Sequence, residues 1–343
     1  MIESIKKVVK KENLNEKEAF EIMLELMKGN LDDIQIAALL VGLRSKGETV
    51  DEITGFAKAM RQTMIELDLN FPAIDMCGTG GDYSGTFNIS TASSIVVAGA
   101  GIKVAKHGNR SMTSKSGSAD VLEALNVDIN KSNENCIRSL EKNNICFMFA
   151  PNFHPAVKNA MNVRSKLKIK TVFNILGPLC NPANVKNQAM GVFDSSLTKI
   201  QAQVLKNLGS KNVMVFNGDD GLDELTTTCG SNISYFLNDS KIINLKFDPK
   251  SVGISLSKHE DLQGGTSDIN AKIILDILNG KKGPNRDIVL LNAAAGIMVG
   301  GKATSLKEGY FLAKESVDSL SALKVLKGIQ TVSYTHLTLP TTL

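Results

Sequence analysis

The segment 73–98 has the sequence AIDMCGTGGDYSGTFNISTASSIVVA, in which a mostly apolar run leads through a glycine-rich stretch into a second apolar run. The first run, Ala73–Met76, is typical of a buried strand, and Thr91–Ala98 is typical of a helix. The glycines between them allow the backbone to approach a ligand closely with positive φ angles. The segment therefore predicts a strand, a tight turn and a helix, the repeating unit of an α/β fold.

The same alternation continues toward the C-terminus. Further strands are predicted at Ile102–Ala105, Ile145–Phe149, Ala189–Phe193 and Val213–Phe216, and a hairpin or meander within Thr226–Lys246. Helices are predicted at Ala119–Leu125, Pro155–Leu167, Thr198–Leu208, Asp268–Leu278 and Leu306–Leu326. Strands that alternate with helices indicate a mostly parallel sheet covered by helices.

Toward the N-terminus, residues 1–66 predict helices and no strand. Apolar residues recur at helical spacing from Ala19 to Leu26, and capping-box pairs at Asp32 and Thr49 mark two further helix starts. We predict a small all-helical domain over residues 1–66 and a large α/β domain over residues 67–331. The final stretch, residues 332–343, carries no Asp, Glu, Lys or Arg. We predict that it is a non-native tail that does not continue the preceding helix.

Composition excludes several classes of protein. The 343 residues are 43% hydrophobic and 22% charged, which excludes a disordered or collagen-like chain. The net charge of +4 is spread along the chain, which argues against a dedicated nucleic-acid binder and suits a protein that handles small anions. No apolar run approaches the roughly 20 residues of a membrane span, and no secretory signal is evident. Five widely spaced cysteines predict reduced thiols in a cytoplasmic protein.

The glycine-rich stretch 77–91 has the composition of a phosphate cradle. Ser90 and Thr91 lie near a helix N-terminus, where free N–H groups and the helix dipole favour an anion. The stretch is neither a Walker A loop nor a GxGxxG motif. A tight turn with a capped helix is the alternative interpretation, and Asp82 and Asn88 favour the functional one.

Two more polar clusters follow predicted strands. The loop Lys106–Ser114 contains cationic, amide and hydroxyl groups suited to phosphate, although a solvated polar loop is the alternative. Ser118 is expected to cap the next helix and is a candidate phosphate contact. The segment Gly218–Leu225 contains adjacent carboxylates, which suit Mg²⁺ or, alternatively, an acidic turn. His107 and His154 are candidate acid–base groups, but no nucleophile triad is evident and no catalytic nucleophile is predicted.

The ordered set of motifs resembles the anthranilate phosphoribosyltransferase family, whose fold is like that of nucleoside phosphorylases. The resemblance runs from the N-terminal helices to about Leu326. It rests on Cys77–Asp82, Asn88–Thr91, Lys106–Ser111, His154-Pro155 followed by Arg164, Gly177–Ala183 and Leu222–Glu224.

The resemblance implies a homodimer with a small helical domain, joined by helices near residues 155–185, and a large α/β domain that binds 5-phosphoribosyl 1-diphosphate (PRPP). It implies transfer of the phosphoribosyl group to the amino group of anthranilate in tryptophan biosynthesis, with one or two Mg²⁺ ions per chain. A pyrimidine nucleoside phosphorylase and a non-catalytic relative that binds nucleic acid are the alternatives. Nucleic-acid and membrane partners are not expected for the transferase.

Site residues are also implied by the resemblance. Mg²⁺ is expected at Ser90, Asp223 and Glu224, and anthranilate at Gly78, Asn109, Arg164, His107 and His154. PRPP is expected to contact Gly78, Gly81, Asp82, Thr86, Asn88, Ile89, Ser90, Thr91, Lys106, His107, Gly108, Asn109, Arg110, Ser111, Met112, Thr113, Ser114 and Ser118. The chain departs from the family pattern at Tyr83, at Cys180 and in the C-terminal tail.

Overall fold

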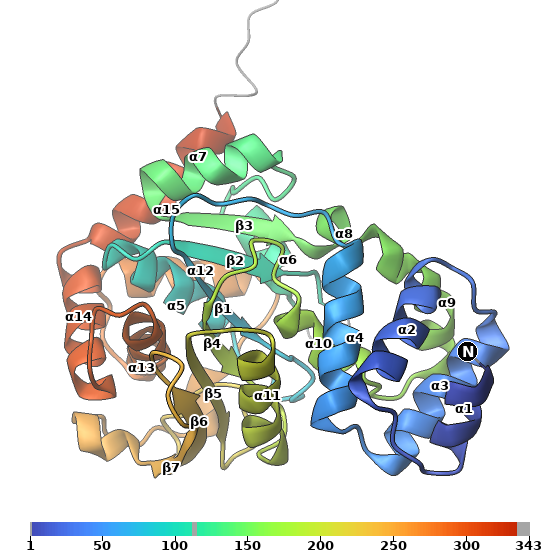
Figure 1. Cartoon of the computed structure of the whole chain (residues 1–343). Helices are drawn as coiled ribbons and strands as arrows, with labels where there is room; N and C mark the ends of the chain where they lie inside the picture. Colours follow the sequence, from blue (N-terminus) through green and yellow to red (C-terminus); the bar gives the residue numbers. More distant parts are fainter. Residues whose placement is uncertain (1, 112–114, 335–343) are drawn as a thin grey trace, which may run out of the picture.

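A helical lobe and a larger α/β lobe make up the computed structural model of the chain (Figure 1), which describes residues 2–111 and 115–334. The predicted loop residues Met112, Thr113 and Ser114, and residues 335–343 of the predicted tail, lie outside the described residues. The helices are α1 Ile2–Val9, α2 Glu16–Met27, α3 Asp33–Lys46, α4 Val50–Thr63, α5 Ile89–Gly99, α6 Ser118–Ala124, α7 Asn133–Asn143, α8 Ala150–Phe153, α9 Lys158–Leu167, α10 Phe173–Leu176, α11 Ser196–Asn207, α12 Ser267–Leu278, α13 Pro284–Val299, α14 Leu306–Asp318 and α15 Ser321–Tyr334.

Capping residues start the helices of the N-terminal lobe. The capping boxes predicted at Asp32 and Thr49 are confirmed at the starts of α3 and α4, and Asn15 forms a third box at α2. Each box satisfies N–H groups that the helix itself leaves unpaired. Helix α9, from the middle of the chain, packs on α2 and α3, so the lobe contains helices from two distant segments.

One seven-stranded sheet forms the centre of the α/β lobe. Its strands are β1 Ile74–Gly78, β2 Val104–Gly108, β3 Ile145–Phe149, β4 Asn187–Gly191, β5 Asn212–Gly218, β6 Ser231–Phe236 and β7 Ile243–Phe247. The spatial order is β3-β2-β1-β4-β5-β6-β7, in which the first five strands are parallel and the last two antiparallel. The five predicted strands, the mostly parallel sheet and the C-terminal meander are thereby confirmed.

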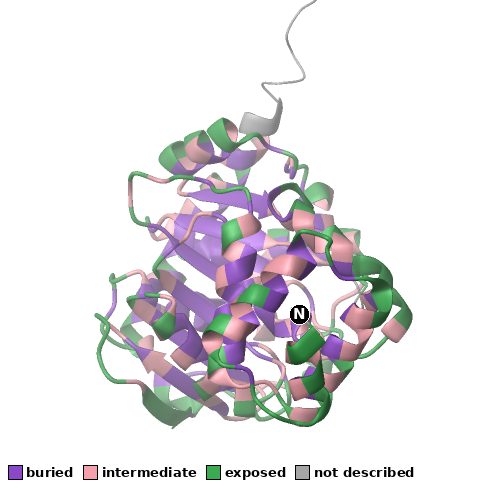
Figure 2. Ribbon diagram, turned by 45° about the vertical axis from the view of Figure 1, so that its right-hand side comes forward, coloured by how far each residue is buried: buried purple, intermediate pink, exposed green. Residues whose placement is uncertain are grey.

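Helices cover both faces of this sheet. Helices α5, α13, α14 and α15 share one apolar cluster on one face. The cluster on the other face includes α11 and continues into the helical lobe through residues such as Phe56 and Leu176. Figure 2 shows the sheet strands largely buried, whereas the outward helix faces are exposed. Within the described ranges, no helix has both the length and the apolar character needed to cross a membrane.

Three predictions about helices were wrong or incomplete. The single helix predicted at Leu306–Leu326 is two helices, because Leu320 adopts a left-handed φ of +62° between α14 and α15. Helix α13 was not predicted because nearly all of its residues are buried, and a helix that is apolar all round has no polar face to reveal its period. The expectation that residues 332–343 leave the last helix is corrected at its start, since α15 continues to Tyr334.

Candidate active site

The site lies where the order of the parallel strands reverses. Strands β1 and β4 are neighbours, and the chain proceeds from them in opposite directions across the sheet. Loops beyond the carboxyl ends of such strands form the usual ligand crevice of an open α/β sheet. Gly78 ends β1 and Gly191 ends β4, and Asp223 from the segment after β5 lies against both glycines.

Glycine at these two strand ends is required by the approach of Asp223. A Cβ atom at Gly78 would lie 2.5 Å from Asp223 Oδ2, and one at Gly191 would overlap the backbone oxygen of Asp223. Asp223 Oδ2 accepts a hydrogen bond of 2.7 Å from the Gly80 N–H. The fold therefore joins two predicted clusters that lie 143 residues apart in the chain.

The glycine-rich loop presents unpaired backbone donors. Gly80, Gly81, Tyr83 and Gly85 all have positive φ angles. Asp82 accepts hydrogen bonds from the Ser84 N–H and hydroxyl, and the hydroxyls of Ser84 and Thr86 are 3.3 Å apart. Among the described residues, the N–H groups of positions 81–83 have no hydrogen-bond acceptor. Such a run of free N–H groups can receive the oxygens of a phosphate.

At the start of α5, the side chains of residues 88–91 differ in their contacts and burial. Asn88 does not cap the helix; its amide instead donates to Ser116 O, and its oxygen accepts from the Asn270 amide at 3.0 Å. Ile89 and Thr91 have buried side chains, which leaves their backbone as the part able to face a ligand. Ser90 Oγ accepts a hydrogen bond of 3.2 Å from Lys106 Nζ.

Lys106 places a buried cation beneath these groups. Its ammonium also donates to Met76 O at 2.6 Å, and its side chain is almost fully buried. Burial lowers the pKa of Lys106, and the charges of Asp75, Glu224 and Asp223 oppose this effect. The lysine is therefore held in one position by the ends of β1 and α5, close to the acidic pair.

Asp223, which is half-buried, and Glu224, which is buried, form an acidic pair. Burial, followed by the charge of Asp82, raises the pKa of Asp223 to about 7. Burial and the charge of Asp223 raise the pKa of Glu224 well above its usual range. Burial disfavours the charged forms of these adjacent carboxylates, and a bound cation would offset that cost.

The donor set fits Mg²⁺. In the part of the chain that the structure describes, no three His, Cys, Asp or Glu side chains are grouped closely enough to form a complete metal site. Mg²⁺ usually binds one or two carboxylates and completes its shell with water and substrate phosphates. Asp219 and Asp220 lie in a turn, which was the alternative interpretation of Gly218–Leu225: Asp219 pairs with Lys246, and Asp220 accepts from the hydroxyls of Thr226 and Thr228.

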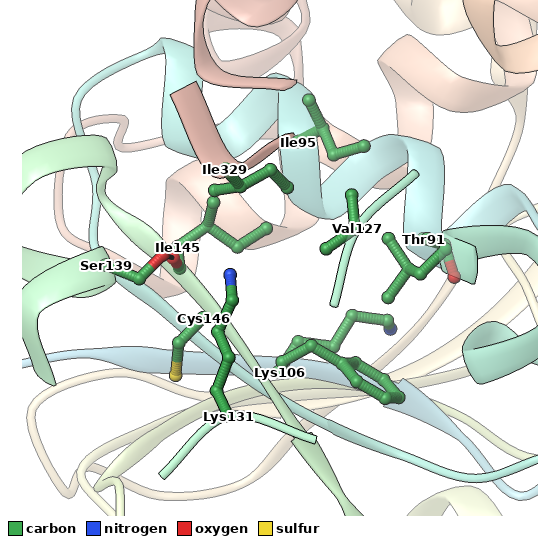
Figure 3. Close-up of a pocket in the computed structure, with 11 residues that line it drawn as sticks. Thr91, Ile95, Lys106, Val127, Lys131, Ser139, Ile145, Cys146 and Ile329 are labelled. Atoms are coloured by element: carbon green, nitrogen blue, oxygen red, sulfur yellow. Dashed lines mark hydrogen bonds between the residues drawn. The ribbon is translucent and has the colours of Figure 1, made fainter. Parts of the chain in front are cut away.

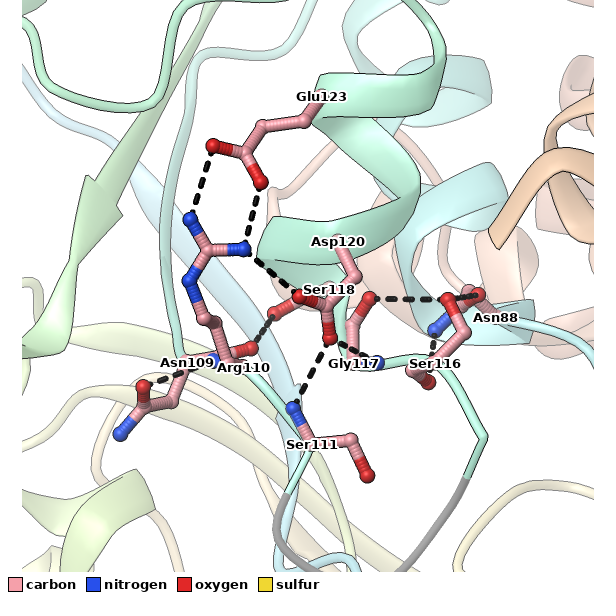
Figure 4. Close-up of polar contacts among 9 residues, drawn as sticks. All are labelled: Asn88, Asn109, Arg110, Ser111, Ser116, Gly117, Ser118, Asp120 and Glu123. Atoms are coloured by element: carbon pink, nitrogen blue, oxygen red, sulfur yellow. Dashed lines mark hydrogen bonds and ion pairs between the residues drawn. The ribbon is translucent and has the colours of Figure 1, made fainter. Parts of the chain in front are cut away.

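The loop after β2 is tied to α6 (Figure 4). Arg110 donates to Glu123 and Asp120 at 2.6–2.9 Å, so its guanidinium is engaged by two carboxylates. The N–H groups of Ser111 and Gly117 donate to Asp120. Ser118 was predicted as the helix cap, which is wrong, because Gly117 is the N-cap. The Ser118 hydroxyl instead donates to Asn109 O, and Gly108 leaves room for it.

Two histidine rings, those of His107 on β2 and His154, lie close together. The ring centroids of His107 and His154 are 5.0 Å apart, and both side chains are buried. Burial lowers the pKa of His107 to about 3 and that of His154 to about 4, so both rings are neutral at pH 7. The turn Gly177–Cys180, which the resemblance also singled out, contacts both rings through its backbone.

Arg164 is a half-buried cation on α9. Its guanidinium stacks over Phe173 at 5.0 Å, and burial lowers its pKa. Within residues 2–111 and 115–334, no carboxylate forms an ion pair with it. An aromatic platform and a free cation can hold a planar carboxylate by paired hydrogen bonds.

Sequence reasoning missed two polar residues here. Asp75 is fully buried in β1, where its Oδ1 accepts from the His107 N–H at 3.3 Å. An acidic residue inside an apolar strand was the available signal. Lys170 was also missed, because a lysine in a linker gives no signal until the fold shows what it contacts.

A small cavity behind the site is too small for a substrate (Figure 3). It has a volume of about 10 Å³ and is lined by Thr91, Lys106, Lys131 and Cys146 among others. A space of this size holds about one water molecule. This cavity therefore cannot be a substrate site.

The buried histidines predict a pH dependence of stability. An unfolded histidine has a pKa near 6.5, whereas folded His154 stays neutral to about pH 4. The unfolded state therefore binds the additional proton, and the free energy of unfolding falls as the pH is lowered from about 6.5 to about 4. We expect His154→Gln to remove up to about 1.4 kcal/mol per pH unit of this loss. Urea unfolding at pH 7, 6 and 5 measures it.

The exposed His259 provides the matched control. His259→Gln is expected to leave the acid dependence as it is in the parent chain. If the free energy of unfolding fell equally steeply with decreasing pH in the parent and in His154→Gln, the assignment of a neutral buried ring would be contradicted.

Comparisons with known proteins agree over most of the chain. The profile described as the glycosyl transferase family, a/b domain, matches residues 70–323, and the one described as the helical bundle domain of that family matches residues 2–64. Anthranilate phosphoribosyltransferase from Thermoanaerobacter sp. (strain X514) is 51% identical over 328 residues, which are 95% of this chain and 97% of the relative.

Solved structures show the same architecture. Anthranilate phosphoribosyltransferase from Thermus thermophilus has a TM-score of 0.91 and 38% identity, covering 96% of this chain and 99% of that one. The enzyme from Saccharomyces cerevisiae in complex with PRPP and Mg has a TM-score of 0.89 and 27% identity, covering 97% and 98%. On these matches, the chain belongs to the anthranilate phosphoribosyltransferase family.

Proposed function

We propose that the chain transfers the phosphoribosyl group of PRPP to the amino group of anthranilate, releasing pyrophosphate, as a step of tryptophan biosynthesis. The observation that carries the proposal is the meeting of the glycine-rich loop, the buried Lys106 and the acidic pair Asp223 and Glu224 at the strand ends. A relative whose structure contains PRPP and Mg supports the assignment.

Each part of the site has a role in binding. The free N–H groups at positions 81–83 and the start of α5 receive phosphate oxygens. Asp223, Glu224 and Ser90 would hold one or two Mg²⁺ ions, which supply positive charge to the departing pyrophosphate. Arg164 faces the carboxylate of anthranilate, and the neutral rings of His107 and His154 line the path of its aromatic ring.

The reaction then needs orientation and charge stabilisation. The bond from the anomeric carbon to pyrophosphate oxygen breaks, the aniline nitrogen forms a new bond to that carbon from the opposite face, and the nitrogen loses one proton. Lys106 is held 3.2 Å from Ser90 Oγ and stabilises negative charge near the phosphates. No side-chain nucleophile takes part in this scheme, so positioning contributes much of the rate.

Pyrophosphate release tests the proposal directly. Release from PRPP is expected only when Mg²⁺ and anthranilate are both present, together with loss of the anthranilate. Phosphorolysis of thymidine or uridine without transfer to anthranilate would favour a nucleoside phosphorylase. Salt-dependent binding of nucleic acid with no transfer would favour the non-catalytic alternative.

Arg164 is expected to determine affinity for anthranilate. Arg164→Ala removes a charge-assisted hydrogen-bonding group worth about 1.5–3 kcal/mol, so the KM for anthranilate rises about 10- to 100-fold while the KM for PRPP changes little. Lys166→Ala on the same helix is the control, since Lys166 is exposed. Steady-state kinetics with each substrate varied in turn measures both constants. Equal rises in the two KM values would place the acceptor carboxylate elsewhere.

We also propose that two copies of the chain associate through the helical lobe. Ile2 and Val9 on α1, and Ile34 and Val41 on α3, are 43–80% exposed and recur at seven-residue spacing on packed helices. An exposed apolar face of this kind favours a protein partner. Sedimentation equilibrium is expected to give twice the mass of the 343-residue chain.

The five unpaired cysteine thiols support a cytoplasmic location.

A further inference from the structure

Lys170 carries a charge that the assigned site does not use. It lies in the linker between α9 and α10, and its Nζ is 3.7 Å from the centre of the Phe193 ring and 5.1 Å from that of Tyr83. Over the described residues, its ammonium has no carboxylate within ion-pair distance. Two aromatic faces hold a cation by cation–π attraction without neutralising it.

The ammonium stands over the glycine-rich turn. A Cβ atom at Gly81 would lie 3.5 Å from Lys170 Cε and 3.8 Å from Nζ, so the lysine passes directly beside the backbone of that residue. The N–H groups of positions 81–83, which have no acceptor among the described residues, belong to the same turn. Free donors and an unpaired cation at one turn form an anion-binding corner.

Tyr83 explains part of this arrangement. It has a φ of +57°, a left-handed conformation that residues other than glycine rarely adopt, and it is 72% exposed. Its ring nevertheless faces Lys170. Phe193 is fixed to the same loop, because its N–H donates to Thr79 Oγ1 at 3.0 Å. The two aromatic rings therefore hold the Lys170 ammonium over the loop by cation–π contacts.

The surrounding charges indicate which part of the substrate binds here. Asp82, Asp194 and Asp223 attract the ammonium from nearby, and Arg44 of α3 repels it. Asp223 belongs to the acidic pair assigned to Mg²⁺, so Lys170 faces the metal side of the crevice. The diphosphate of PRPP is the substrate group that Mg²⁺ accompanies.

We propose that Lys170, seated on Tyr83 and Phe193, binds the diphosphate group of PRPP and helps to position it over the glycine-rich loop. This inference rests on the proposed function. It extends the phosphate site from the two loops of the α/β lobe to the linker that enters the helical lobe. The role is one of binding and positioning, since the ammonium need not touch the reacting carbon.

Pyrophosphate itself is the first probe. Calorimetric titration of the full chain with Mg²⁺–pyrophosphate measures binding without catalysis. Lys170→Met is expected to weaken this binding about 10- to 100-fold and to raise the KM for PRPP by a similar factor. The KM for anthranilate should change less than about twofold. Lys170→Arg, which keeps the charge, should bind within a few-fold of the parent.

Further variants separate the contribution of the aromatic ring of Tyr83 from that of the Lys170 charge. Tyr83→Ala removes one aromatic face and is expected to weaken pyrophosphate about 2- to 5-fold, whereas Tyr83→Phe should have no effect. Lys166→Met, an exposed lysine of α9, is the control for loss of one positive charge. Thermal unfolding confirms that each variant is folded.

Two results would overturn the inference. One is unchanged pyrophosphate binding in Lys170→Met, and the other is an equal loss in Lys170→Arg. A parent chain that binds Mg²⁺–pyrophosphate through Lys170 but does not consume anthranilate would leave this inference intact and refute the proposed acceptor. The two failures are therefore distinguishable.

Discussion

Glu224→Gln is expected to lower kcat/KM about 100- to 1,000-fold, the scale seen when a group that stabilises developing charge is removed. The carboxylate is buried, and its neighbour Asp223 is also acidic, so the pair attracts a cation that Gln does not bind with the same charge. Pyrophosphate release from PRPP over a range of Mg²⁺ concentrations measures the effect. The apparent requirement for Mg²⁺ should rise in the variant.

The same change is expected to stabilise the chain in the absence of Mg²⁺. Burial raises the pKa of Glu224, so the charged form that exists in the unfolded chain at pH 7 is disfavoured in the folded one. A neutral amide removes that cost. Thermal unfolding should therefore show a higher Tm for Glu224→Gln than for the parent without Mg²⁺, and a smaller increase on adding Mg²⁺.

Glu260→Gln is the control, because Glu260 is an exposed carboxylate that forms no ion pair among the described residues. It should leave both the rate and the Mg²⁺ dependence unchanged. Full activity of Glu224→Gln at ordinary Mg²⁺ concentration would refute the assignment of this residue as a metal ligand.

Glu52→Ala is expected to destabilise the helical lobe by about 3–5 kcal/mol, the cost of leaving a buried charge without its partner. Glu52 Oε2 accepts from Lys46 Nζ at 2.7 Å and from the Thr49 N–H, and Oε1 accepts from the Leu14 N–H at 2.9 Å. The two charged side chains are 0% and 2% exposed, so water cannot replace the lost contacts.

Urea unfolding measures this loss against a matched exposed pair. Glu16 pairs with Lys58 in the same lobe, but both side chains are about two-fifths exposed, and Glu16→Ala should cost at most about 1 kcal/mol. Replacing both partners together, as Glu52→Leu with Lys46→Met, should recover much of the stability lost in Glu52→Ala. Similar small losses for Glu52→Ala and Glu16→Ala would show that the buried pair is not important for stability.

Local chemistry explains which elements could be predicted. The capping boxes at Asp32 and Thr49 and the apolar runs of β1–β5 act over a few residues, so their positions follow from the sequence. The break at Leu320 could not be predicted in this way, since nothing in the local pattern requires a left-handed residue there. The sequence of helix α13 shows no helical period of apolar and polar residues, because nearly all of its residues are buried.

The candidate site, too, has features that the sequence indicated and features that only the structure showed. The composition of the glycine-rich loop, the loop after β2 and the acidic segment indicated phosphate and Mg²⁺ from the residues alone. That Arg110 pairs with Asp120 and Glu123 was not visible in the sequence, where Arg110 was grouped with the phosphate contacts. The roles of the individual residues remain predictions, which the variants above test.

The sequence by itself determined the classes of group available: glycines that permit positive φ, hydroxyls at a helix start, adjacent carboxylates and an arginine on a helix. Only the tertiary structure decided their partners and charge states, because both depend on contacts between distant segments. Gly191 had to lie beside Asp223, and Lys106 beneath Ser90. Burial then set His107 and His154 neutral and raised the pKa of the acidic pair, since desolvation acts only after the chain has folded.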